Sequence, residues 1–354
     1  MGHRANYVVV ERGAHRVHYS QFGALSLGAD PLMGPEELES YIRSLETREQ
    51  LTDDVWCEGS LVLDLDTRTL LFWSEHCAAG VNLELRRALL RLVGELWPGW
   101  TVRWAAREHA EVVAHLGLAP EGLISTREPE DGPAVDEVVA SLNEGMRMLG
   151  VPKNVEDQRR EITEHGDPDP YYLDAETILT VRFGDGVVRD FSTMYRIADV
   201  LRSGAELVPA LESAPGTSLP RVEHVRSGAL IDVQTRTVTA WPVQPLRAED
   251  HAERWPGWQV TWTDLGLPGQ VAATGRDPVA VAQTPAHLAR EAAALVGASD
   301  QVAQVQQGLE EHIAQVRGEG AEILAQAERA PVPPAPRDGR AELALRIIEL
   351  YGAE

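Results

Sequence analysis

The feature that most constrains the fold of this chain is an internal repeat. The segment at 63–73 (LDLDTRTLLFW) recurs at 231–241 (IDVQTRTVTAW), and the segment at 97–104 (WPGWTVRW) recurs at 255–262 (WPGWQVTW). Two shared blocks in the same order, one of them with three tryptophans, indicate a duplication within the chain. The repeat predicts two similar folding modules, but it does not name a reaction.

In the first copy, turn residues and apolar alternation predict β-hairpins at 7–20 and 55–76. Pro35 begins a predicted helix, and Asn82 is the predicted N-cap of a second helix whose leucines share one face. The Trp-Pro-Gly tripeptide at 97–99 ends that helix, because proline cannot continue it and glycine suits the turn. A short strand and a last helix complete the module.

The second copy repeats this order with one element shortened. A single helix over 194–211 is expected between its two hairpins. Trp73 and Trp97 are 24 positions apart, whereas Trp241 and Trp255 are 14 positions apart. The missing residues fall in the amphipathic helix between the repeated blocks, so most of that helix is expected to be absent from the second copy.

The patterns together predict an α+β protein. It consists of two tandem, diverged β-β-α-β-β-α-β modules, the second one shortened, followed by a long heptad-patterned C-terminal helix. The expected divisions are module one at 1–118, a polar joint with a short helix at 119–174, a degenerate module two at 175–270, a long helical segment at 284–330, a Pro-rich linker at 331–336 and a short amphipathic terminal helix at 337–354.

The heptad pattern predicts a buried stripe on the long helix. Apolar residues recur at intervals of seven, namely Leu288, Leu295, Val302, Leu309, Val316 and Ile323. A stripe of this kind must be buried against something. The position four residues after each of these is the second core position of a heptad, and half of these second positions are polar or glycine. Packing of the stripe against the rest of the protein and packing in an intermolecular coiled coil therefore both remain open.

The last helix is a candidate for binding a protein partner. Leu343, Ile347, Leu350 and Tyr351 lie on one side of it, and a proline-rich arm precedes it. A tethered amphipathic helix is typical of docking peptides. The alternative is a helix that closes the protein's own core.

The overall charge argues against several classes of partner. With 55 acidic and 32 basic residues, the formal net charge is −23, which repels the phosphates of nucleic acids and anionic lipids. No nucleic-acid or membrane partner is therefore expected, and the lack of a signal-type or membrane-spanning apolar run favours a cytoplasmic location. Lys153 is the only lysine, so a Walker-type ATP site is excluded.

The second hairpin of module one suggests a reactive pair. If its turn centres on Thr67, Glu58 faces His76 across the hairpin, just as Leu61 faces Trp73. A carboxylate beside an imidazole can fix its tautomer and raise its pKa, as general base catalysis requires. Glu58 and His76 are therefore the candidate catalytic residues.

Module two has lost this pair, because Arg226 and Gln244 stand at the matching positions. Either module one has a functional site that module two lost, or these are surface residues whose sequence diverged between the copies. The same register places Cys57 opposite Cys77, and these thiols are alternatives as metal ligands or, with His76 or His18, as nucleophiles. Zinc needs three or four ligands, however, and no Cys-x-x-Cys or His-x-x-x-His spacing supplies them. No metal and no cofactor are predicted, and the cysteines are expected to be buried free thiols.

The Trp-Pro-Gly-Trp blocks favour core packing at a helix-to-strand corner over an aromatic platform for a ligand. Both copies retain them, although one copy has lost a helix.

Three functions follow from these patterns. The leading interpretation is a non-enzymatic cytoplasmic protein-binding or scaffold protein, with an immunity or defence-accessory role as one form, which assembles or binds a partner through residues 284–354. The first alternative is a hydrolase-type enzyme with its site at Glu58 and His76 in module one. The second alternative is a small-molecule sensor that binds its ligand between the two modules.

Overall fold

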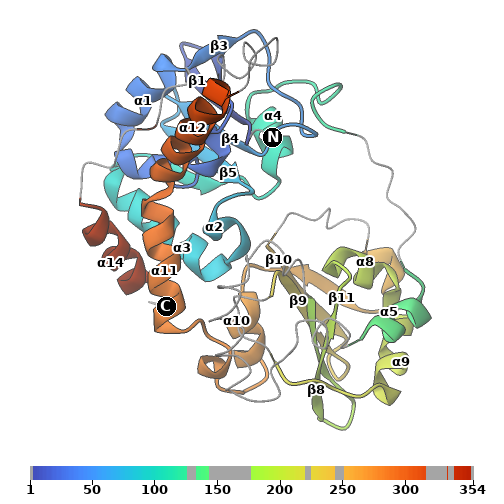
Figure 1. The fold of residues 1–354 in the computed structure, drawn as a ribbon. Coiled ribbons are helices and arrows are strands. Elements are labelled where there is room, and N and C mark those ends of the chain that lie inside the picture. Colours follow the sequence, from blue (N-terminus) through green and yellow to red (C-terminus); the bar gives the residue numbers. More distant parts are fainter. Residues whose placement is uncertain are drawn as a thin grey trace. The chain divides into compact units, whose positions relative to one another are not determined.

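The computed structural model describes residues 3–125, 133–142, 177–219, 225–243, 251–315, 333 and 339–351. The chain is a mixed α+β protein that divides into two compact units, each built on one β-sheet (Figure 1). Unit 1 comprises Met1–Thr126 and Thr284–Glu354, and unit 2 comprises Arg127–Gln283. In the described part of the chain, every helix is too short or too polar to cross a bilayer.

Unit 1 contains a six-stranded sheet with the order β3-β2-β1-β4-β5-β6. β1 pairs in parallel with β4, and β5 pairs in parallel with β6, whereas the other neighbours are antiparallel. The strands are β1 (Ala5–Glu11), β2 (Ala14–Ser20), β3 (Glu46–Arg48), β4 (Gly59–Asp64), β5 (Thr69–Ser74) and β6 (Thr101–Trp104). Because Gly59 pairs with both Ala5 and Ser74, β1 and β4 begin where β5 ends. This end of the sheet is called the site end below.

Alternate side chains of the unit 1 strands enter two separate cores. Tyr7 and Leu61 belong to a first core, which also contains the buried side chains of α1 (Pro35–Ser44) and α3 (Leu83–Leu96). Val8 and Val62 belong to a second core on the opposite face, which α4 covers. The helices of this part are η1 (Gly23–Leu25), η2 (Asp30–Met33), α1 (Pro35–Ser44), α2 (Ala78–Val81), α3 (Leu83–Leu96) and α4 (Glu108–His115).

The predicted cap of α3 is confirmed, because the Asn82 side-chain oxygen accepts a hydrogen bond of 3.0 Å from the backbone N–H of Leu85. This bond satisfies one of the N–H groups that a helix leaves unpaired at its start.

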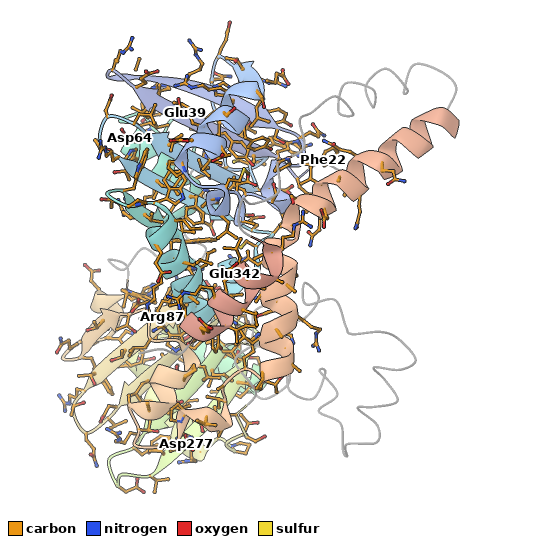
Figure 2. All side chains as sticks on the ribbon, turned by 90° about the vertical axis from the view of Figure 1, so that its left-hand side faces the viewer. Phe22, Glu39, Asp64, Arg87, Asp277 and Glu342 are labelled. Atoms are coloured by element: carbon orange, nitrogen blue, oxygen red, sulfur yellow. The ribbon has the colours of Figure 1, made fainter. Side chains whose placement is uncertain are left out.

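The predicted register of the β4–β5 hairpin is wrong by one residue. Leu61 pairs with Phe72 rather than with Trp73, because the connection contains four residues and has no central residue. The carboxylate of Asp64, labelled in Figure 2, accepts the backbone N–H groups at 66 and 67 at 3.0 and 2.9 Å. Arg68 then takes a left-handed conformation with φ of 52°, which closes the turn.

Unit 2 contains a five-stranded sheet with the order β11-β10-β9-β7-β8. The strands are β7 (Thr177–Arg182), β8 (Val188–Thr193), β9 (Ser227–Asp232), β10 (Thr237–Pro242) and β11 (Gln259–Trp262). This order matches β2-β1-β4-β5-β6 of unit 1 read in the opposite direction, and the parallel and antiparallel pairs correspond.

The β9–β10 turn of unit 2 resembles the β4–β5 turn of unit 1. The Asp232 carboxylate accepts two backbone N–H groups, and Arg236 has φ of 55°. The two sheets are therefore similar.

The helices of unit 2 are shorter than the sequence predicts. The expected helix over 194–211 is replaced by two short helices, because Gly204 with φ of 72° interrupts the chain between them. Between β10 and β11, the described residues contain only a 3-10 helix ahead of Trp255. The helices are α5 (Val135–Ser141), α8 (Ile197–Arg202), η4 (Gly204–Glu206), α9 (Leu207–Ser213), η7 (Ala252–Arg254), α10 (Gly266–Ala272) and η8 (Pro278–Ala280).

The two Trp-Pro-Gly-Trp corners have the same construction. Trp97 is buried and its indole N–H donates to the carbonyl of Pro31 at 2.7 Å, while Trp255 is buried and donates to the carbonyl of Leu201 at 2.9 Å. Each of these rings also meets the second tryptophan of its block edge-on, with ring centroids 5.0 and 5.3 Å apart. Trp97 and Trp255 are thus core residues of their units.

The heptad segment does not form one continuous helix. It contains α11 (Pro285–Val296) and α12 (Ala298–Gln315), which are separated at Gly297. Leu288, Leu295 and Val302 are buried, and the two leucines belong to the first core of unit 1. The side chains of Leu309, Val316 and Ile323 lie outside the described residues. The described start of the stripe therefore packs within the chain.

The terminal helix α14 (Arg340–Leu350) packs against α11 and α3 (Figure 1). Arg340 forms an ion pair with Asp300 of α12, and Arg346 forms one with Glu95 of α3 at 3.0 Å. Of the expected proline-rich linker at 331–336, only Pro333 lies within the described residues.

Candidate functional site

Three polar side chains gather at the site end of unit 1. His3 lies two residues before β1, Glu58 lies one residue before β4, and His76 lies two residues after β5. The parallel pair β1–β4 brings the first two positions together, and the antiparallel pair β4–β5 adds the third. Residues from three distant parts of the sequence therefore meet because of the sheet topology.

The backbone at each of the three positions is held by hydrogen bonds. The N–H of His3 donates to the carbonyl of Gln21 at 2.8 Å, and its carbonyl accepts from Ala24 at 3.0 Å. The N–H of Glu58 donates to the carbonyl of Arg4 at 2.9 Å, which extends the β1–β4 ladder by one step.

His76 is held through a serine at the end of β5. Its N–H donates to the hydroxyl of Ser74 at 3.1 Å, and that hydroxyl donates to the carbonyl of Ala24 at 2.6 Å. His3 and His76 are thus both tied to the same short segment around Ala24. The three side chains start from fixed backbone positions.

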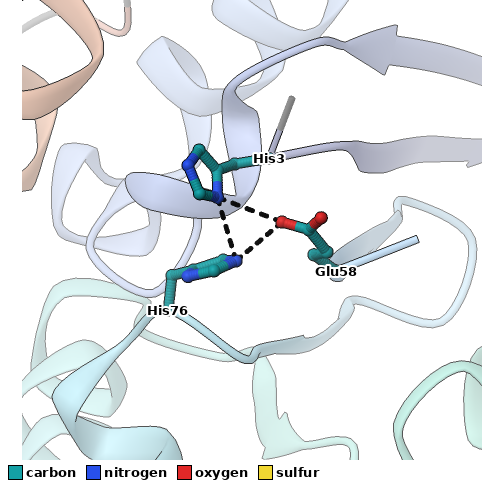
Figure 3. Close-up of side chains that lie close together, drawn as sticks. All are labelled: His3, Glu58 and His76. Carbon is teal, nitrogen blue, oxygen red and sulfur yellow. Dashed lines mark hydrogen bonds and ion pairs between the residues drawn. The ribbon is translucent and has the colours of Figure 1, made fainter. Parts of the chain in front are cut away.

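The three side chains form a close triangle of nitrogen and oxygen atoms (Figure 3). Nε2 of His76 lies 2.6 Å from Oε2 of Glu58, and Nδ1 of His3 lies 3.1 Å from each of these two atoms. The side chains of His3, Glu58 and His76 are 33%, 26% and 18% exposed, so the triangle is partly accessible to solvent. Among the described residues, this is the grouping whose ligand atoms are close enough to hold a metal ion.

The electrostatic balance at this site leaves His3 neutral. Burial lowers the pKa of His3 below its usual 6.5, and the neighbouring His76 lowers it further, while Glu58 opposes both effects. A pKa below 6.5 means that most molecules carry an uncharged His3 imidazole at pH 7. An uncharged imidazole can either donate or accept at Nδ1.

Glu58 and His76 meet although their predicted pairing is incorrect. Across the hairpin, the residue opposite Glu58 is Glu75, whose N–H donates to the Glu58 carbonyl at 2.9 Å. The chain turns directly after β5, and this turn returns the His76 side chain to Glu58. A catalytic role for the pair stays a prediction. His3 was not among the predicted residues, because no local spacing in the sequence connects it with the other two residues.

The cysteines are separated rather than paired. Cys57 belongs to the second core and Cys77 to the first, on opposite faces of the sheet, so they do not form the two-thiol metal site considered from the sequence. Burial raises the pKa of Cys57, and it raises the pKa of Cys77 to about 11. Both thiols therefore stay protonated at neutral pH, which argues against the nucleophilic role considered for either of them.

A rigid turn beside the site displays an exposed tryptophan. Trp56 is 57% exposed and its neighbour Val55 is 67% exposed, while the Arg4 guanidinium lies 5.0 Å from the centre of the Trp56 ring. The Asp53 carboxylate accepts the N–H groups of Val55 and Trp56 at 3.0 and 3.2 Å. These bonds fix the backbone of the turn that carries the two exposed side chains.

A buried asparagine fastens the same turn to β1. The side chain of Asn6 donates to the carbonyl of Thr52 and accepts its N–H, both at 3.0 Å. It also donates to the sulfur of Cys57 at 3.1 Å. Asn6 therefore fixes both the start of the Trp56 turn and the residue that precedes Glu58.

The candidate binding residues of the terminal helix face the interior of unit 1. Leu343 and Ile347 are buried in the first core, and Leu350 and Tyr351 pack against it while partly exposed. The apolar side of α14 is thus covered by the protein itself.

Unit 2 carries no copy of the triangle among its described residues. Arg226 precedes β9 as Glu58 precedes β4, and the counterpart of His76, Gln244, lies outside the described residues. The site is a feature of unit 1 alone in the described part of the chain. No family model, no curated protein and no solved structure matches this chain.

Proposed function

We propose that this protein is a non-enzymatic protein-binding or scaffold protein, and that its contact surface on unit 1 is centred on Trp56. The observation that carries the proposal is a large aromatic side chain, 57% exposed, on a turn whose backbone is already fixed by Asp53. Tryptophan and arginine are the residues most enriched at the energetic centres of protein interfaces. Here Arg4 already stacks on the Trp56 ring.

The rigidity of the turn supports a binding role. A side chain presented on a fixed backbone loses little conformational entropy when a partner covers it, so more of the contact energy appears as affinity. Asn6 is buried and bonds to Thr52, and Asp54 accepts hydrogen bonds from Ser125 at 2.9 Å. The turn is thus held from both β1 and the segment after α4.

The charge of the chain indicates the chemistry of the partner. With a formal net charge of −23, the protein attracts a basic partner and repels other acidic proteins. Long-range attraction of this kind mainly accelerates association and weakens as salt is added. We therefore propose a partner with a basic surface around an apolar pocket that accepts Trp56.

The C-terminal helices support this proposal less than the sequence suggested. The apolar sides of α11 and α14 are covered within unit 1, so their described parts offer no second apolar face to a partner.

The proposal is tested by affinity capture with paired variants of the full chain. Trp56→Ala should lose the partner that the wild type recovers, whereas Val279→Ala, which truncates a 71% exposed valine on unit 2, should retain it. With the purified partner, Trp56→Ala is expected to cost about 2 kcal/mol or more of binding free energy by calorimetry. Recovery of the same partner by Trp56→Ala, or tighter binding at higher salt, would contradict the proposal.

A second candidate, a hydrolase-type enzyme, rests on the 2.6 Å contact between Glu58 and His76. In this function, Glu58 orients the imidazole and His76 moves a proton. A panel of ester, amide and phosphoester substrates tests it. Activity should fall with Glu58→Gln and persist with His115→Ala, which breaks the separate His115–Asp64 pair. Equal activity of the two variants would exclude Glu58 from the reaction.

We also infer that the two units arose by duplication of one α+β module. The shared strand order, the repeated Asp64 and Asp232 turns and the two tryptophan corners support this inference. An experimental structure of unit 2 in which β7 pairs with strands other than β8 and β9 would refute it.

A further inference from the structure

The triangle at the site end contains a set of atoms that suits a metal ion. Two imidazole nitrogens and one carboxylate oxygen converge, and the dashed lines in Figure 3 join all three. Two histidines with one carboxylate form a frequent ligand set for zinc and for non-haem iron in proteins. Each of the residues His3, Glu58 and His76 supplies one atom to it.

The distances within the triangle are slightly shorter than those of atoms that share one ion. Tetrahedral bonds of about 2.0–2.2 Å to a single ion place its ligand atoms about 3.3–3.6 Å apart. Two sides of the triangle are 3.1 Å, and the third, between Glu58 and His76, is 2.6 Å. All three sides lie at hydrogen-bonding distance, and each would lengthen when an ion takes the place of the shared protons.

The three ligand atoms already share their contacts with one another. Nδ1 of His3 and Nε2 of His76 both lie within hydrogen-bonding distance of the same Glu58 oxygen. A metal ion binds a histidine through a ring nitrogen that carries no proton, so metal–ligand bonds would replace these contacts.

The supporting backbone makes the triangle a prepared site. His3 is bonded on both sides to the segment from Gln21 to Ala24, and His76 reaches the same segment through Ser74. The ligand atoms thus need little rearrangement, which reduces the free-energy cost of binding. The partial exposure of all three side chains leaves other coordination positions open to water or to a small ligand.

We propose that unit 1 binds one divalent transition-metal ion of the Zn²⁺ class through Nδ1 of His3, Oε2 of Glu58 and Nε2 of His76. This proposal is independent of the Trp56 surface. It also differs from the hydrolase candidate in its roles, because Glu58 and His76 would hold the ion instead of transferring a proton. Metal binding can therefore succeed or fail whether or not the protein hydrolyses anything.

The experiment is a Zn²⁺ titration of the full chain, freed of any affinity tag and stripped with a chelator. Competition with a chromophoric chelator should show that each wild-type chain binds one Zn²⁺ ion tightly. Loss of a residue that only hydrogen-bonds to a metal ligand lowers metal affinity by roughly 10–100-fold. His3→Ala and His76→Ala remove a ligand itself, so each should lower the affinity for Zn²⁺ by more than that. His115→Ala is the matched control, since His115 also contacts a carboxylate, that of Asp64 at 3.0 Å, and should bind Zn²⁺ as the wild type does.

Two results would overturn the proposal. One is a wild-type protein that does not bind a Zn²⁺ ion tightly, and the other is a His76→Ala protein that binds Zn²⁺ as tightly as the wild type. Circular dichroism and thermal unfolding of each variant show whether its fold is intact. If His3→Ala unfolds, Glu58→Gln provides the second test, because it keeps the shape of the side chain and removes the anionic ligand. Co²⁺ in place of Zn²⁺ gives a visible spectrum that should change with each ligand variant and not with His115→Ala.

Discussion

The hydroxyl of Tyr7 donates a 2.6 Å hydrogen bond to Oδ2 of Asp30 in the first core of unit 1. Both side chains are buried. Burial raises the pKa of Asp30 to about 7, although hydrogen bonds from Tyr7 and Ser26 act in the opposite direction. The native state therefore favours the neutral acid, and this preference couples the folding of unit 1 to pH.

Replacement of Asp30 by asparagine should change the pH dependence of stability. An unfolded aspartate ionises near pH 3.9, whereas native Asp30 keeps its proton up to about pH 7. Between these values the native state binds more protons, so this group makes wild-type stability fall as pH rises. In urea unfolding from about pH 5 to about pH 8, Asp30→Asn should show a flatter profile and be more stable than the wild type at the upper end. Parallel profiles for the two proteins would rule out this role of Asp30.

Removal of the Asn6 side chain should destabilise unit 1. Asn6→Ala leaves the N–H and carbonyl of Thr52 without their side-chain partner, which costs about 1–3 kcal/mol of unfolding free energy. Ser125→Ala removes an exposed bond to Asp54 and should change stability by less than about 0.5 kcal/mol. Chemical denaturation of the two variants measures the difference. Equal stability would mean that the Asn6 bonds do not hold the Trp56 turn.

A methyl group should be tolerated differently at two glycines of unit 2. Gly204 and Gly275 both have positive φ, 72° and 80°, so alanine is strained at each by about 1 kcal/mol. A Cβ atom at Gly204 would also clash with the carbonyl oxygen of Arg254, whereas nothing lies within 4 Å of such an atom at Gly275. Gly204→Ala should therefore lower the melting temperature clearly more than Gly275→Ala. The reverse order would contradict the close approach at Gly204.

The two tryptophan corners should respond alike to the same substitution. Trp97→Phe and Trp255→Phe each remove an indole N–H from a buried carbonyl, of Pro31 and Leu201 respectively, and leave a small void. Each is expected to cost about 2–4 kcal/mol of stability in its own unit. Hydrogen exchange of the two units can assign each loss. A large cost in one unit and none in the other would show that the corners are not equivalent.

The sequence predicted local structure best where one residue type has one clear role. Asn82 caps α3 as expected, because its side chain can accept an N–H that the helix leaves unpaired. The recurrence of Asp64 and Arg68 as Asp232 and Arg236 likewise corresponds to two turns with the same hydrogen bonds. Each of these features depends on residues that are close in the sequence.

The errors concern features that depend on distance along the chain or on exact turn length. The predicted β4–β5 register was wrong by one residue because the pattern does not specify the length of the turn, which contains four residues and therefore has no central residue. The heptad segment was predicted as one long helix, straight or kinked, because the apolar residues recur in register on both sides of Gly297, where the chain divides into two helices. His3 was missed because only the pairing of β1 with β4 brings it to Glu58.

The metal site is tested most directly by anomalous X-ray diffraction from crystals grown with Zn²⁺ and recorded on both sides of the zinc absorption edge. We expect a peak at the site end of unit 1, within about 2.0–2.2 Å of Nδ1 of His3, Oε2 of Glu58 and Nε2 of His76. A structure in which these three atoms stay hydrogen-bonded while zinc is absent or bound elsewhere would contradict it.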